Sequence, residues 1–226
     1  MILSARHPLV LAPGLMTLAQ LKLIHQEQQF IALPESCRSD IRKSQALVEA
    51  YADGDTPVYG VNTGFGKLAN QRINKEQLHT LQLNLIRSHS VGVGEPLSAP
   101  IIRLMMATKA ASLARGYSGV REIVIDTLLA VHNAGLVPDV PSQGSVGASG
   151  DLAPLAHMTL SLLGEGYIWV SGIKIPALEA LKDAGIAPLT LQAKEGLALL
   201  LNGTTCLLIF QGLTTLMHLR KKIVMN

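Results

Sequence analysis

The chain has 226 residues, enough for one large domain or for one domain and the start of another. Hydrophobic residues make up 48% of the chain and charged residues 15%, which argues against a disordered protein and indicates a well-buried core. The formal net charge is only +3, lysines and arginines are scattered, and aromatic residues reach just 4%. A dedicated nucleic-acid surface is therefore not expected.

Neither a membrane span nor a metal site is expected. The longest apolar stretch, from Cys206 to Met217, is interrupted by a Gln-Gly pair and is shorter than the roughly 18 residues that a span needs. Pro13-Gly14 interrupts the short apolar N-terminal stretch, and no convincing cleavage site follows, so we expect a cytoplasmic protein. The histidines and the two cysteines lack metal-ligand spacing, and Cys37 and Cys206 are expected to be free thiols.

Hydrophobic periodicity predicts a mainly α-helical fold with one small β hairpin. The first helix is expected to start with a capping box formed by Thr17 and Gln20. The hairpin is expected at Tyr167–Val170 and Ile173–Ile175, joined by Ser171-Gly172. The other helices are expected at about 39–51, 74–89, 100–116, 121–133 and 152–163, and again after Pro176 and after Thr190.

Two glycine-rich stretches interrupt the helical pattern. Residues 59–66 read YGVNTGFG and residues 143–151 read QGSVGASGD, with three glycines in each. Because ordering glycine costs more entropy than ordering other residues, such stretches between helices indicate unusual backbone, although composition alone leaves two ordinary loops equally open. Neither stretch fits a familiar motif. Val61 stands where a Walker A loop needs glycine, and Asp151 stands where a nucleophile elbow needs it.

The tripeptide Ala148-Ser149-Gly150 permits a different chemistry. In a tight bend, the amide nitrogen of Gly150 can attack the carbonyl carbon of Ala148, because small side chains leave that approach open. Loss of one water closes a five-membered ring, and loss of a second water from Ser149 leaves an exocyclic methylene. The product, a methylidene-imidazolone (MIO), is an electrophile in a chain whose side chains otherwise offer nucleophiles. The tripeptide alone is common by chance, so its surroundings decide its meaning.

These surroundings resemble the MIO-dependent aromatic amino-acid lyases, the family of histidine, phenylalanine and tyrosine ammonia-lyases. GSVGASGDLAPLAHM is similar to the family's MIO signature, and YGVNTGFGKLAN is similar to its tyrosine loop. LQLNLIRSHSVGVGEPL and KEGLALLLNGT resemble two further family segments, in the family's order and at roughly its spacing. The resemblance runs from about Leu15 to Thr204, whereas the family's own chains are more than twice as long as this one.

The resemblance implies a fold and a division of the chain. Residues 1–204 would form the N-terminal, MIO-bearing domain of the histidase/aspartase-like helical fold. Residues 205–226 would be the start of the central helical region, or a divergent or truncated tail. Ala148, Ser149 and Gly150 would form the MIO, and the helix that starts at Asp151 would direct its positive N-terminal end toward it.

The resemblance also assigns two side chains to the substrate. Tyr59 matches the family's catalytic tyrosine, which can act as a base only where its site stabilises the phenolate. His89, within SHSVG, matches the SH-x-x-G of the family's histidine-specific members, and we expect it to hydrogen-bond a substrate imidazole. The remaining histidines show no metal-ligand spacing, and His157, which lies within GSVGASGDLAPLAHM, is expected to pack.

Asn202 matches the asparagine of the family's LNGT segment, expected near the MIO carbonyl or the substrate amine. The sequence departs from the family here, because Glu195 and Asn202 are seven residues apart where the family has six. The extra residue is a leucine within 199–201, and one inserted residue turns the rest of a helix by about 100°. Either a π-bulge absorbs the insertion or Asn202 points away from the site.

The activity implied by the resemblance is elimination of ammonia from L-histidine to give trans-urocanate. MIO would be the only cofactor, no nucleic acid or membrane would be bound, and a homotetramer is expected for the full-length family. The family's carboxylate-binding segments lie in the part that this sequence does not match, so a truncated, non-catalytic or partner-dependent domain with a relic site is the alternative. We also expect exposed apolar faces on the helix at 100–116 and from Leu197 to Phe210, and hence self-association.

Overall fold

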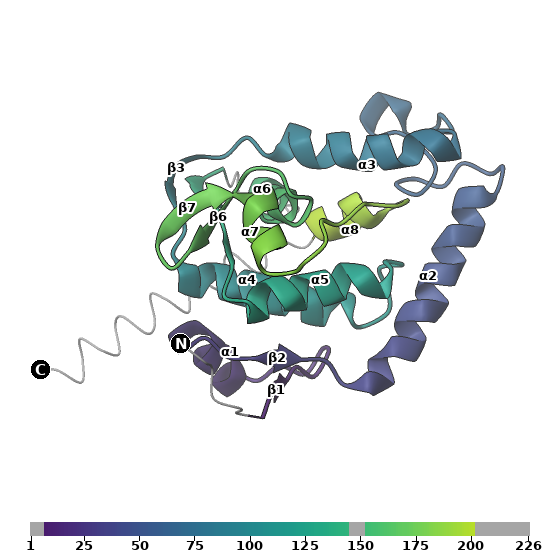
Figure 1. Cartoon of the computed structure of the whole chain (residues 1–226). Coiled ribbons are helices and arrows are strands. Elements are labelled where there is room, and N and C mark those ends of the chain that lie inside the picture. The colour runs from purple at the N-terminus through teal and green to yellow at the C-terminus, as the bar shows by residue number, and fades with distance from the viewer. Residues whose placement is uncertain (1–6, 145–151, 202–226) are drawn as a thin grey trace, which may run out of the picture.

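The structure, a computed structural model, describes residues 7–144 and 152–201, and it is built mainly from helices arranged in layers (Figure 1). Helix α3 (Lys75–His89) forms one outer layer, and α1 (Leu18–Gln26) lies on the opposite side of the molecule. Helix α2 (Arg38–Asp53) runs along one edge from the α1 side to the α3 side. The remaining helices lie between these outer layers. They are α4 (Ala99–Leu113), α5 (Glu122–Asn133), α6 (Leu152–Leu162), α7 (Ala177–Asp183) and α8 (Glu195–Leu200).

The predicted mainly α-helical fold and its hairpin are confirmed. Helix α1 starts with the expected capping box: the N–H of Gln20 donates to Thr17 Oγ1, and the N–H of Thr17 donates to Gln20 Oε1. Strands β6 (Tyr167–Val170) and β7 (Ile173–Pro176) form the expected antiparallel hairpin. Its turn places both Ser171 (φ 50°) and Gly172 (φ 84°) in the left-handed region, as a two-residue type I′ hairpin turn requires.

Five further strands are too short for their sequence to show an alternating pattern. Strands β1 (Leu9–Val10) and β2 (Ile31–Ala32) pair in parallel, and β4 (Val137–Pro138) adds a third strand to the hairpin through β6. Strands β3 (Val93–Pro96) and β5 (Pro141–Gln143) pair antiparallel. Two 3₁₀ turns, at Glu35–Cys37 and Gly66–Leu68, complete the described elements. The β3–β5 pair matters most here, because it joins the chain that follows α3 to the chain that precedes α6.

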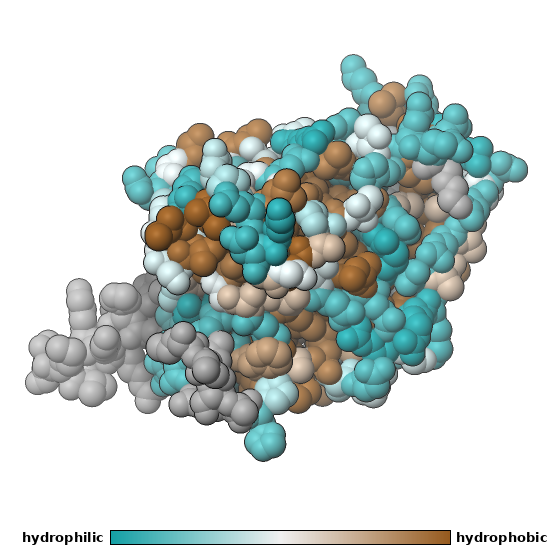
Figure 2. All heavy atoms as spheres, viewed as in Figure 1, coloured by the Kyte–Doolittle hydropathy of each residue, from teal (hydrophilic) through white to brown (hydrophobic). Residues whose placement is uncertain are grey.

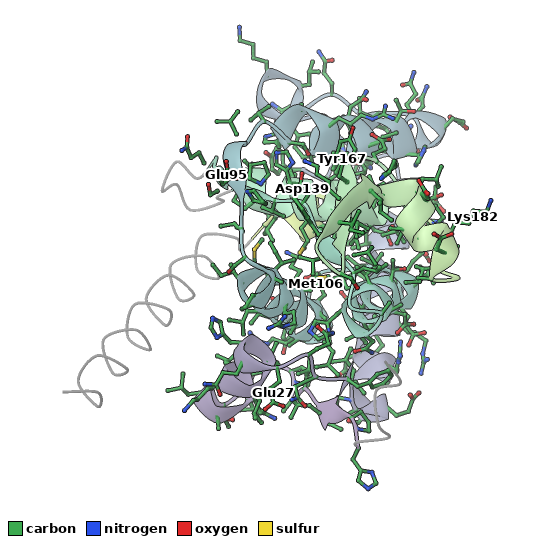
Figure 3. The ribbon with its side chains drawn as sticks, turned by 60° about the vertical axis from the view of Figure 1, so that its left-hand side comes forward. Glu27, Glu95, Met106, Asp139, Tyr167 and Lys182 are labelled. Carbon is green, nitrogen blue, oxygen red and sulfur yellow. The ribbon has the colours of Figure 1, made fainter. Side chains whose placement is uncertain are left out.

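The expectation that the helix at 100–116 exposes an apolar face is wrong. Helix α4 packs against α1 on one side and α5 on the other, and its hydrophobic residues are buried around most of its circumference. Met106, 1% exposed, lies in the middle of the molecule (Figure 3). Leu199 and Leu200 in α8 are likewise fully buried. These helices therefore form the core within this chain rather than a surface that needs other segments to cover it.

Some hydrophobic side chains remain at the surface, among them Ile173 (65% exposed) and Leu178 (56% exposed) around the hairpin and α7 (Figure 2). Within the described ranges, no helix is long and apolar enough to cross a membrane. The same ranges contain no group of three or more His, Cys, Asp or Glu side chains that could hold a metal ion. Cys37 is a free thiol, and Cys206 lies outside the described residues.

Candidate active site

The loop that carries Tyr59 is organised by the side chain of Asn62. This amide is fully buried; its Oδ1 accepts from the N–H of Val58 (2.7 Å), and its Nδ2 donates to the carbonyls of Tyr51 and Thr56 (3.0 Å each). One side chain thus ties the end of α2 to both sides of the Tyr59 turn. The sequence analysis did not predict a role for Asn62, although it belongs to the quoted YGVNTGFG stretch. The available signal was an amide side chain within a glycine-rich loop, where such side chains often bond to the backbone.

Tyr59 itself projects from this ordered loop. Its side chain is 60% exposed, and its ring lies edge-on to Phe65 with 5.9 Å between the ring centroids. The next residue, Gly60, has φ +73° and packs directly on α8, where any Cβ would overlap the side chain of Leu197. Glycine is therefore required at this position, because it supplies both the backbone conformation and the space. The rigid loop presents the phenol of Tyr59 outward.

His89 is the last residue of α3, and its ring is held by the helix itself. Its Nδ1 lies 2.8 Å from the carbonyl oxygen of Leu85. Because a carbonyl oxygen can only accept, Nδ1 must carry the proton, and in the neutral ring Nε2 keeps its lone pair. The Ser88 hydroxyl, 3.2 Å from Nδ1, donates to the same Leu85 carbonyl. The half-buried His89 ring can therefore offer Nε2 as a hydrogen-bond acceptor.

The end of α3 is fastened to α6 and the loop that follows it. The guanidinium of Arg87 forms a two-pronged ion pair with Glu165, with Nε to Oε2 at 2.9 Å and Nη2 to Oε1 at 2.5 Å. Beyond the helix, the N–H of Gly92 donates to Nε2 of His157 at 3.0 Å. The two contacts lie on either side of His89 in the sequence, so its position relative to α6 is fixed twice.

The residues predicted to form the MIO, Ala148, Ser149 and Gly150, lie outside the described residues, but the chain on both sides of them is described. Gly144 ends the β5 side, and α6 starts at Leu152. A Cβ on Gly144 would stand 3.1 Å from the Cα of Gly92 and 3.2 Å from the Cβ of Ala153. The two flanks of the tripeptide are thus held against each other and against the segment that follows His89.

Helix α8, which leads toward Asn202, is held at both ends. At its start, the carboxylate of Glu195 pairs with Arg121. At its end, the ammonium of Lys109, 2% exposed, donates to the carbonyls of Ala198 and Leu201 at 2.6 Å each. A buried cation at a helix C-terminus satisfies carbonyls that the helix cannot and opposes the negative end of its dipole. The sequence pattern did not single out Lys109, because a lysine at an otherwise apolar helix position carries no motif.

The extra leucine is not absorbed by a π-bulge in the described part of α8. The helix is regular from Glu195 to Leu200, and the N–H of Leu201 still donates to the carbonyl of Leu197, four residues earlier. Leu201 then adopts an extended conformation. Asn202 lies outside the described residues, so the direction of its side chain stays a prediction.

The Tyr59 loop and His89 are attached to different parts of α3. The Tyr59 loop is bonded to the residues just before the helix, since the N–H of Ile73 donates to the carbonyl of Asn62. His89 ends the same helix, which has 15 residues and therefore spans about 20 Å. The flanks of Ala148-Ser149-Gly150 lie at the His89 end. The described fold thus brings His89 together with the flanks of Ala148-Ser149-Gly150, whereas the Tyr59 loop packs on the first half of α3 and on Leu197 of α8.

Comparison with known proteins identifies the family. A family model described as aromatic amino acid lyase matches residues 16–221. The chain is 56% identical to a histidine ammonia-lyase of Aromatoleum aromaticum over 194 residues, which is 86% of this chain and 37% of that protein. It is 54% identical to a histidine ammonia-lyase of Burkholderia pseudomallei over 197 residues, which is 87% of this chain and 38% of that protein.

Solved structures show the same fold. The histidine ammonia-lyase of Trypanosoma cruzi superposes with a TM-score of 0.79 at 38% identity, over 87% of this chain and 38% of that one. A tyrosine aminomutase of Streptomyces globisporus gives a TM-score of 0.80 at 35% identity, over 88% of this chain and 37% of that one.

The helical fold is that of the aromatic amino-acid lyases and aminomutases. The chain belongs to the aromatic amino-acid lyase family, and the predicted family membership is confirmed. It spans 37–38% of the length of the curated histidine ammonia-lyases cited here. An MIO cofactor is supported at the level of the family.

Proposed function

We propose that this chain is the cofactor-forming part of a histidine ammonia-lyase, which eliminates ammonia from L-histidine to give trans-urocanate. One observation carries the proposal. The His89 imidazole, with Nε2 free to accept, is fastened at the same end of the fold as the two flanks of Ala148-Ser149-Gly150. The identity of 53–56% to histidine ammonia-lyases supports the same substrate.

The described residues fit the formation of an MIO between them. Ring closure needs a tight bend, and contact between Gly144 and Ala153 across the segment supplies ends that already lie together. Helix α6 begins at Leu152, directly after the motif, so its positive N-terminal end would favour negative charge there. The MIO, once formed, supplies an electrophilic carbon that no ordinary side chain offers. Asn202 would hydrogen-bond near its carbonyl or the substrate amine.

His89 would determine substrate specificity. Because its Nδ1–H is engaged by the Leu85 carbonyl, Nε2 can accept a hydrogen bond from the N–H of a substrate imidazole. Phenylalanine and tyrosine have no ring N–H to donate, so they would leave Nε2 without a partner in a closed site. A site built around such a bond rejects an analogue that lacks it.

Tyr59 would remove a proton from the substrate β-carbon. Val58 and Val61 of its loop pack with Leu78 and Leu81 in the first half of α3, whereas His89 is the last residue of that helix. The family resemblance implies a homotetramer, in which a Tyr59 from a second copy would complete the site. A cytoplasmic location belongs to the same proposal.

The mass of the intact chain tests the cofactor. MIO formation removes two waters, and Ser149→Ala should keep the full mass. Helix content measured by circular dichroism should be the same in both proteins. An unmodified mass for the parent chain would favour the alternative, a non-catalytic domain with a relic site.

Urocanate formation tests the activity. It is followed by absorbance with L-histidine, using this chain alone and this chain fused to the remaining part of the Aromatoleum aromaticum relative. Turnover by the fusion protein, lost with Ser149→Ala, would support the proposal. A fusion protein that carries the modification but forms no urocanate would contradict the proposed activity while leaving the cofactor assignment intact.

A further inference from the structure

His157 was expected only to pack, but its ring makes a directed contact. It lies on α6, and its Nε2 is 3.0 Å from the backbone nitrogen of Gly92. Since a backbone N–H can only donate, Nε2 must be unprotonated, and the neutral ring carries its proton on Nδ1. Burial lowers the pKa of His157, and the nearby carboxylate of Asp139 opposes that shift only in part. The ring is thus kept in the neutral form that this contact requires.

The contact leads directly to His89. Gly92 follows His89 by three residues, and Ser90 closes the helix between them: both its N–H and its hydroxyl donate to the carbonyl of Ile86. The backbone between His89 and Gly92 is therefore held by hydrogen bonds at Ser90 and at Gly92. On the other side of His89, Arg87 is paired with Glu165. His89 is bracketed by two contacts, both made to α6 and the loop after it.

Gly92 is closely packed. A Cβ at this position would stand 3.2 Å from Nε2 of His157 and 3.3 Å from the carbonyl oxygen of Gln143. A side chain of similar shape that cannot accept would fill the same space as His157, but it would leave the half-buried N–H of Gly92 without its partner. Shape and hydrogen bonding can therefore be separated by substitution.

We infer that His157 is a positioning residue for His89: by accepting the N–H of Gly92, it fixes the end of α3 so that Nε2 of His89 faces the substrate. The inference goes beyond the proposed function and rests on it for the identity of the substrate. The structural part, that His157 controls the position of His89, stands on the described contacts alone.

The test uses three variants of the full 226-residue chain. His157→Phe keeps a flat ring but removes the acceptor, and His157→Gln restores an acceptor, since its Oε1 can reach the place of Nε2. His79→Phe is the matched control. It removes another imidazole-to-backbone contact of α3, that of Nδ1 with the carbonyl of Leu191, at the exposed middle part of the helix.

The first readout needs no ligand and no activity. Hydrogen exchange at the Gly92 amide should be about tenfold faster in His157→Phe, should return close to the parent rate in His157→Gln, and should not change in His79→Phe. The ring resonances of His89 should shift in His157→Phe alone. Parent-like exchange and unchanged His89 resonances in His157→Phe would overturn the inference. Mass-spectrometric detection of exchange keeps the test valid if the chain self-associates.

The second readout is binding of L-histidine, measured by calorimetry. It uses the same substitutions in the fusion with the remaining part of the Aromatoleum aromaticum relative, in a Ser149→Ala background that prevents turnover. Affinity should fall about tenfold in His157→Phe and recover in His157→Gln, with no change in His79→Phe. Equal affinity in the Phe and Gln variants would contradict a positioning role, even if exchange at Gly92 changed. A parent fusion protein that binds no L-histidine would count against the proposed function, while exchange and the His89 resonances would still decide whether His157 positions His89.

Discussion

The guanidinium of Arg121 and the carboxylate of Glu195 form a two-pronged ion pair at the start of α8, with Nε to Oε1 at 2.9 Å and Nη2 to Oε2 at 2.8 Å. Glu195 is 1% exposed, and its carboxylate also accepts from the backbone N–H groups of Arg121 (3.0 Å) and Gln192 (2.7 Å). The pairing with Glu195 raises the pKa of Arg121. This buried pair fixes the helix that leads to Asn202 against the start of α5.

Removing the carboxylate should therefore be costly. Glu195→Ala leaves four N–H donors without their acceptor, and we expect a loss of about 3–5 kcal/mol in the free energy of unfolding. Glu165→Ala breaks the exposed pair with Arg87 and should cost at most about 1 kcal/mol, which makes it the control. Urea denaturation followed by circular dichroism measures both. Equal, small losses would mean that the Arg121–Glu195 pair contributes little.

Acid should destabilise the fold through His132. This residue is 1% exposed, and burial lowers its pKa from 6.5 to about 4. Since the unfolded chain then binds the proton more readily than the folded one, stability is full above pH 6.5 and falls as the pH drops toward 4, by about 3 kcal/mol in total. His132→Phe should remove this part of the loss.

Unfolding free energies of the parent and of His132→Phe, measured between pH 7 and pH 4.5, check this expectation. Burial also lowers the pKa values of His25 and His157, so both proteins should lose some stability in acid. The difference between the two curves isolates His132. Parallel curves would show that its ring is protonated equally well in the folded chain.

His89→Leu should move substrate preference from histidine toward phenylalanine. The variant removes the acceptor Nε2, and losing one hydrogen-bond partner in a closed pocket is worth about 1–3 kcal/mol in the ratio of the two specificity constants. The measurement uses the fusion with the remaining part of the Aromatoleum aromaticum relative, and it compares kcat/KM for the two amino acids. An unchanged ratio would remove His89 from substrate recognition.

The chain alone should show negligible turnover. The chain spans only 37–38% of the length of the histidine ammonia-lyases cited above. Losing substrate positioning can cost orders of magnitude in rate, because fixed geometry supplies several kcal/mol of a typical barrier. Self-association is still expected, but its basis is now the exposed side chains around the hairpin, such as Ile173 and Leu178, rather than α4. A monomer by light scattering that forms urocanate as fast as the fusion protein would contradict both expectations.

The sequence by itself determined the local structure and the chemistry that one segment can perform. Periodicity located the long helices, the Thr17–Gln20 pair marked the start of α1, and Ser171-Gly172 marked the hairpin turn, because each of these signals depends on residues close in sequence. The motifs around Ala148-Ser149-Gly150 and His89 likewise indicated the family, since the reactivity of a tripeptide depends on residues that are adjacent in sequence.

Only the tertiary structure decided which of these residues meet. The burial of α4 between α1 and α5, the pairing of β3 with β5, the contact of His157 with Gly92 and the pairing of Arg121 with Glu195 all join residues distant in sequence. No local pattern encodes such contacts, because they depend on how whole layers pack. The same packing placed His89 beside the flanks of Ala148-Ser149-Gly150 and the Tyr59 loop against the first half of α3.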